Sequence, residues 1–66
     1  MTIKYIDEFS NNNLTTKEFP SDEYEWNIMP ESYGRLIQIF KKNTKEGKWN
    51  IVLVIPTHNL ISIEDK

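Results

Sequence analysis

Short stretches in which apolar and polar residues alternate predict several β-strands along this chain. Every second residue between positions 23 and 28 is polar, which is the pattern of a strand with one buried face. Residues 48–55 give the strongest strand pattern, because that segment is almost continuously apolar. Residues 60–64 predict a further strand, and the looser alternation of residues 1–9 predicts a short one at the beginning of the chain.

One segment fits two kinds of secondary structure. Residues 34–41 are rich in isoleucine and phenylalanine, which favours a strand. Four apolar residues also fall at the helical spacing i, i+3, i+4 and i+7, namely Tyr33, Leu36, Ile37 and Phe40. Gly34 inside the first turn and Ile39 off the apolar face argue against this helix. We therefore expect a strand at 34–41, with a helix as the alternative.

Clusters of turn-forming residues separate these segments. Residues 10–13 are Ser-Asn-Asn-Asn, whose side chains bond to the local backbone and favour a loop. Residues 15–18 have the spacing of a helix capping box, but Pro20 leaves room for barely one turn. The polar residues 42–47 end in glycine and suit a long hairpin loop, and residues 56–59 predict a turn.

These elements together predict a mainly β fold in one small domain covering residues 1–66. The expected form is an antiparallel β-meander with strands near 23–28, 34–41, 48–55 and 60–64, or a small barrel that resembles SH3-like or Sm-like barrels in architecture. The amino-terminal segment then adds a strand or packs across one face. The alternative is an α+β fold in which a helix near 31–42 packs on a three-stranded sheet.

The strand at 48–55 is apolar on both of its faces. Because successive side chains point to opposite sides of a sheet, regular alternation places one set of apolar residues on one face, namely Trp49, Ile51, Leu53 and Ile55. Val52 and Val54 then lie on the other face, where a strand with one solvated side carries polar residues. Either another part of this chain covers these valines, or a second chain does.

Composition excludes several kinds of chemistry. The chain has no cysteine, and no apolar run approaches the length of about 20 residues that a membrane helix needs, so we expect a cytoplasmic protein without disulfides. His58 is the only histidine, and nothing in the sequence arranges a nucleophile and an acid around it. Glu23 and Glu25 share a strand face, yet a solvated face explains them as well as a metal site. We therefore predict no enzyme activity, no cofactor and no metal.

Charge is distributed unevenly along the chain. Residues 1–33 carry two lysines against seven acidic residues, and residues 34–66 carry six basic residues against three acidic ones. The basic part includes a lysine cluster beside an aromatic residue at the expected hairpin tip, namely Lys41, Lys42, Lys45, Lys48 and Trp49. Lysines that contact phosphates and an aromatic ring that stacks on a base are typical of single-strand binding. Lysines at a loop tip also keep strand edges soluble.

The acidic part offers a different surface, in which Tyr24 and Trp26 lie among Glu23 and Glu25. Tyrosine and tryptophan are frequent anchors in protein interfaces. A 66-residue chain without disulfides also buries a small core, which favours self-association or a permanent partner.

The sequence therefore predicts a non-enzymatic protein that acts by protein–protein contact, with another protein or with copies of itself. The first interface candidates are Glu23, Tyr24, Glu25, Trp26, Val52 and Val54. Many residues with A/T-rich codons indicate a low-GC bacterial system, for example a phage-encoded inhibitor or accessory factor. The alternative function is a small β-barrel that binds RNA or single-stranded DNA through the lysine-rich hairpin.

Overall fold

The computed structural model describes residues 1–43 and 48–65, without the side chains at positions 43, 48 and 49. Six strands and three single-turn 3-10 helices lie in these ranges. The strands are β1 (Thr2–Asp7), β2 (Asn13–Glu18), β3 (Tyr24–Ile28), β4 (Leu36–Asn43), β5 (Lys48–Pro56) and β6 (Leu60–Glu64). The 3-10 helices are η1 (Glu8–Ser10), η2 (Pro30–Ser32) and η3 (Thr57–Asn59).

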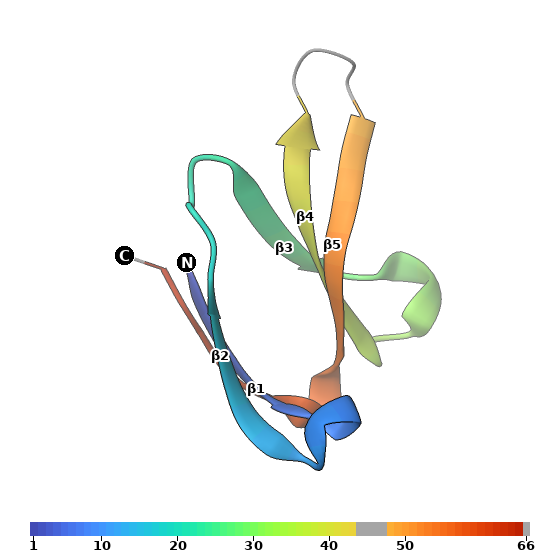
Figure 1. The fold of residues 1–66 in the computed structure, drawn as a ribbon. Coiled ribbons are helices and arrows are strands. Elements are labelled where there is room, and N and C mark those ends of the chain that lie inside the picture. The colour runs from blue at the N-terminus through green and yellow to red at the C-terminus, as the bar shows by residue number, and fades with distance from the viewer. Residues whose placement is uncertain (44–47, 66) are drawn as a thin grey trace.

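The strands form two antiparallel sheets of three strands each (Figure 1). One sheet has the order β2-β1-β6 and the other has the order β3-β4-β5. The chain passes from the first sheet to the second between β2 and β3, and it returns through η3 between β5 and β6. Within the described part of the chain, β2 and β6 are the edge strands of the first sheet, and β3 and β5 are those of the second.

The prediction of a mainly β fold is confirmed, and the α+β alternative is wrong. Its helix near 31–42 is replaced by strand β4, which pairs with β3 on one side and with β5 on the other. Only η2 is helical in that region, and it ends where Tyr33 and Gly34 adopt positive φ angles of 55° and 82°. No helix within residues 1–43 and 48–65 is long and apolar enough to cross a membrane.

Two features of the sheet that contains the amino-terminal strands differ from the expected meander. Residues 13–18, for which we expected no regular element, form β2 after a tight turn in which Asn11 and Asn12 have φ angles of 56° and 58°. The last strand, β6, pairs with β1 and not with β5. Residues 1–18 thus supply two strands of a second sheet, and β2 lacked an apolar pattern because five of its six residues are exposed.

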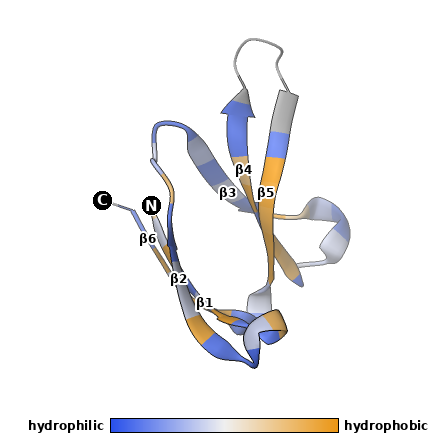
Figure 2. Ribbon diagram, in the orientation of Figure 1, coloured by the Kyte–Doolittle hydropathy of each residue, from blue (hydrophilic) through white to orange (hydrophobic). Residues whose placement is uncertain are grey.

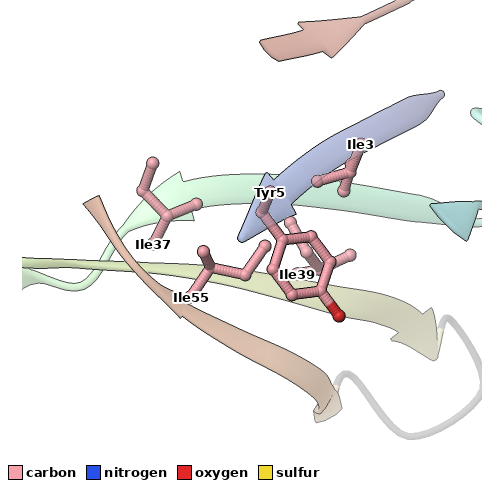
Figure 3. Close-up of a cluster of buried hydrophobic side chains, with 5 residues drawn as sticks. All are labelled: Ile3, Tyr5, Ile37, Ile39 and Ile55. Atoms are coloured by element: carbon pink, nitrogen blue, oxygen red, sulfur yellow. The ribbon is translucent and has the colours of Figure 1, made fainter. Parts of the chain in front are cut away.

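The core lies between the two sheets and consists mainly of isoleucine. Figure 3 shows its buried side chains, which are Ile3, Tyr5, Ile37, Ile39 and Ile55. Three of them, Ile3, Ile39 and Ile55, are fully buried, and each such side chain contributes about 1.5–3 kcal/mol when it leaves water. Because β-branched side chains have high β-propensity, this set of residues favours strands and fills the space between them.

Candidate protein-binding surfaces on strand β5

The register of β5 contains a bulge that moves one predicted residue to the other face. Ile39 pairs with Leu53, but the next residue of β4, Phe40, pairs with Ile51, so Val52 is an extra residue in β5. Ile51 consequently lies on the same side as Phe40 and Val54. The prediction that Ile51 shares the face of Leu53 is wrong, because it assumed unbroken alternation. We call Ile51, Val52 and Val54 the outer-face patch.

The outer-face patch is open to solvent. Ile51 is 53% exposed, Val52 is 47% exposed and Val54 is 43% exposed. A depression of about 410 Å³ adjoins it, lined by Glu25, Asn27, Gln38, Phe40 and Ile51. Figure 2 shows that β5 is hydrophobic over much of its length. No described residue buries the two valines to the extent seen in the core. The sequence pattern identified this apolar face, and about half of each of these three side chains is exposed in the structure, whereas Phe40 on the same face is buried.

Strand β5 also presents unpaired backbone groups at its outer edge. The Thr57 N–H group donates a hydrogen bond of 2.9 Å to the Arg35 carbonyl oxygen, so the neighbouring pair of Leu36 and Pro56 is a non-hydrogen-bonded one. Hydrogen-bonded and non-hydrogen-bonded pairs alternate along an antiparallel ladder. The N–H and C=O groups of Val54, two residues before Pro56, therefore point away from β4 and towards the free edge.

A cleft of about 270 Å³ lies along this edge. Its walls come from β1, η1, β2, β5 and η3, and it is lined by Tyr5, Ile6, Asp7, Glu8, Phe9, Lys17, Leu53, Val54, Ile55, Pro56 and Asn59. Most of the exposed lining is apolar, and Asp7, Glu8 and Lys17 contribute charged side chains. We call it the edge cleft.

The Tyr5 hydroxyl belongs to a buried residue that lines the edge cleft. Tyr5 is only 5% exposed, and in Figure 3 its hydroxyl oxygen points away from the isoleucine side chains. No described residue forms a hydrogen bond with this oxygen. Because every fully enclosed side-chain oxygen of the described residues has a partner, the Tyr5 hydroxyl is not fully enclosed and contacts solvent in the cleft. Burial, and secondarily the negative charge of Asp7, raises the pKa of the Tyr5 hydroxyl.

The carboxylates at the rim are held by hydrogen bonds. Asp7 caps η1, because its Oδ1 atom accepts a 3.0 Å hydrogen bond from the Phe9 N–H group. Glu8 Oε1 accepts a 2.8 Å hydrogen bond from Asn59 Nδ2 and lies 3.4 Å from His58 Nε2. The bond from Asn59, followed by the one from His58, lowers the pKa of the Glu8 carboxyl. Within the described ranges, no three acidic or histidine side chains form a metal-binding group.

The acidic interface candidates do not form a free aromatic surface. Trp26 is 45% exposed, whereas Tyr24 is half-buried against Phe19, with 5.0 Å between ring centroids. Glu25 forms an ion pair of 2.7 Å with Lys42. Glu23 is exposed, and its carbonyl oxygen accepts a hydrogen bond from the Lys42 N–H group. The structure thus brings part of the acidic set and part of the lysine set together.

The nucleic-acid candidates are described only in part. Lys42 is engaged with Glu25, and the Lys41 ammonium lies 6.0 Å from the centre of the Tyr24 ring. Lys45 and the side chains at positions 48 and 49 lie outside the described residues. Both described lysines therefore have a partner within the fold.

Sequence reasoning missed the edge cleft. Its walls come from segments about 50 residues apart, and the hydrogen bond between Glu8 and Asn59 joins η1 to η3. The polar pattern of β2 gave no sign of a strand there, so the second wall was not expected. Comparison with protein-family models, with curated proteins and with solved structures finds no match to this chain.

Proposed function

We propose that this chain is a small non-enzymatic binding protein that acts by protein–protein contact through the outer-face patch of β5. The observation that carries the proposal is the exposure of Ile51, Val52 and Val54 on one strand. Contiguous exposed apolar surface on a small domain is typical of an interaction site. A partner that covers the patch recovers roughly 25 cal/mol for each Å² of apolar area removed from water.

The surroundings of the patch suit a protein partner. The adjoining depression is bordered by amide groups and by Glu25, whose charge is balanced by Lys42. An apolar centre with a polar, nearly neutral rim is the usual composition of a protein interface. The nucleic-acid alternative has less support, because Lys41 and Lys42 already interact with Tyr24 and Glu25.

The composition supports a narrower setting for this function. Residues with A/T-rich codons are abundant, and glycine, alanine and arginine are scarce. A small binding protein with this composition fits a phage-encoded inhibitor or accessory factor of a low-GC bacterium. The partner is then a protein of that host, or a second copy of this chain.

The test replaces one patch residue with a charged one. We expect Val52→Lys to fold, since the Val52 side chain is exposed, and to lose association by at least about tenfold in dissociation constant, since a partner would have to bury the ammonium group. The matched control is Leu14→Lys, which makes the same kind of change at a 62% exposed residue of the other sheet. Circular dichroism checks the fold of both variants.

Association is measured in two ways. Sedimentation velocity at several concentrations reports binding between copies, and affinity capture from a low-GC bacterial lysate reports a host partner. The proposal requires one interaction that the wild-type chain and Leu14→Lys retain and that Val52→Lys loses. A wild-type chain that stays monomeric and captures the same proteins as Val52→Lys would contradict it.

A further inference from the structure

The geometry of the edge cleft points to a binding site for an extended peptide segment of a partner protein. In this arrangement the segment pairs with β5 at Val54, accepts or donates a hydrogen bond at the Tyr5 hydroxyl, and places a basic side chain near Asp7 and Glu8. The site goes beyond the proposed function, because it uses the backbone groups at the edge of β5, whereas the outer-face patch uses side chains, including that of Val54. Either site can therefore fail without the other.

The backbone of β5 supplies the first part of the argument. Val54 presents both an N–H donor and a C=O acceptor to the free edge, and only an extended backbone matches this pair of groups at strand spacing. The addition of a strand to an open sheet edge is a recurrent mode of peptide recognition. The bulge at Val52 ends the regular edge on one side, and Pro56 ends it on the other, so the pairing is short.

The Tyr5 hydroxyl supplies the second part. Tyr5 is only 5% exposed, yet no described residue forms a hydrogen bond with its hydroxyl group. A polar group that is held in place by the core but opens on a cleft is ready to bond with a ligand atom. A peptide carbonyl or hydroxyl that enters beside Leu53 and Ile55 would reach it from the cleft.

Charge at the rim supplies the third part. Asp7 and Glu8 line the edge cleft, and Glu8 bonds to Asn59, three residues after Pro56, whereas Lys17 is the one lysine among the lining residues. The carboxylates therefore outnumber the ammonium group, and Glu8 Oε2 has no partner among the described residues. A lysine or arginine of the segment is complementary to these carboxylates.

The size of the cleft agrees with a peptide side chain. Sites for drug-sized molecules occupy about 300–1,000 Å³ and are mostly enclosed. The edge cleft measures about 270 Å³ and is open along a strand, so it has room for one or two side chains of an extended segment. The remaining residues of such a segment lie outside the cleft, along the edge of β5.

The test uses two synthetic peptides and the full chain. The probe is acetyl-Lys-Val-Thr-Val-Lys-amide, and its twin has glutamate in place of both lysines, so strand direction does not affect the comparison. Amide chemical shifts of the 15N-labelled chain locate the binding site and give the dissociation constants. We expect shifts centred on Val54 and the Tyr5 region, and at least about tenfold weaker binding of the glutamate peptide.

Three variants examine the separate contacts. Val54→Pro removes the edge N–H group without removing a β4 hydrogen bond, and Val54→Thr is its control because it keeps that group. Tyr5→Phe removes only the hydroxyl. We expect Val54→Pro to abolish binding of the lysine peptide, Tyr5→Phe to weaken it about threefold to tenfold, and Val54→Thr to leave it intact. If Val54→Pro does not fold, the effect of Tyr5→Phe on peptide binding decides whether the inference stands.

Several outcomes would overturn this inference. Equal binding of the glutamate peptide, or no shift at Val54 with either peptide up to about 2 mM, would remove the site. Shifts confined to Ile51 would move peptide binding to the outer-face patch and leave the proposed function standing. Shifts at Val54 that depend on protein concentration alone would make a second copy the occupant. Conversely, peptide binding that survives Val52→Lys supports an edge site separate from the patch.

Discussion

At the scale of the residue, Tyr5 connects the isoleucine core to the edge cleft. Tyr5 packs among isoleucines and still brings a hydroxyl to the surface of the cleft. Its place in the core follows from its position in a strand, two residues after Ile3, and that much could be predicted from alternation. Its missing hydrogen-bond partner could not be predicted, because this depends in part on side chains from β5 that are distant in sequence.

Tyr5 makes the stability of the fold sensitive to alkaline pH. Its pKa is raised in the folded protein, so its contribution to stability is complete below the ordinary tyrosine pKa and is lost as pH rises through the folded value. We expect Tyr5→Phe to match the wild type within about 0.5 kcal/mol at pH 7, since the hydroxyl has no described partner, and to be more stable than the wild type at alkaline pH. Urea unfolding across this range measures the difference.

The control for this prediction is Tyr33→Phe, at a side chain that is 94% exposed. It keeps Tyr5, so its stability should follow the wild-type curve across the whole range. Parallel curves for the wild type and Tyr5→Phe above pH 10 would show that the environment of the hydroxyl does not change on folding.

At the scale of the element, the position of β5 was the easiest to predict, but the direction in which its side chains face was the hardest. Its apolar run gave its position within one residue, since residues 48–55 were expected and Lys48–Pro56 is observed. The bulge at Val52 was beyond sequence reasoning, because neither glycine nor proline marks it. One extra residue was enough to move Ile51 to the other face.

The bulge predicts unequal effects for two single-residue deletions. Deleting Val52 makes the β4–β5 ladder regular and leaves Leu53 and Ile55 on the core face, so we expect a folded protein within about 1 kcal/mol of the wild type. Deleting Gln38 from the central strand puts Ile37 next to Ile39 and forces one of them off the core face. We expect that variant to lose at least about 2 kcal/mol.

Urea unfolding followed by far-UV circular dichroism measures both variants, and the Ile39–Leu53 and Ile37–Ile55 contacts are followed by nuclear Overhauser effects. A Val52 deletion as damaging as the Gln38 deletion would mean that the bulge is required for the fold.

The β2 strand was missed for a different reason from the bulge. Its residues face solvent, so its sequence has no apolar period from which a strand could be predicted.

At the scale of the whole molecule, two small sheets share one thin core. Its centre is Ile3, Ile39 and Ile55, one residue from each of β1, β4 and β5. The composition predicted a small core, and the alternation predicted strands, but the division into two sheets depends on pairing between β1 and β6 at opposite ends of the chain. Such long-range pairing leaves no local pattern.

The thin core predicts a steep dependence of stability on one side chain. We expect Ile39→Ala to cost about 2–5 kcal/mol, a large share of the total for a domain of this size, because Ile39 is fully buried. Ile51→Ala, at a 53% exposed residue of the same sheet, should cost about 1 kcal/mol or less. Urea denaturation of the two variants gives the comparison, and equal losses would place Ile51 in the core.

The separation of Trp26 from the isoleucine core has a spectroscopic consequence. Its indole ring is 45% exposed in the folded chain, so its emission already reflects contact with water before unfolding begins. Fluorescence from this ring is therefore a weak reporter of global unfolding. A shift of its emission to shorter wavelength on mixing with another molecule would instead indicate that this part of β3 has been covered.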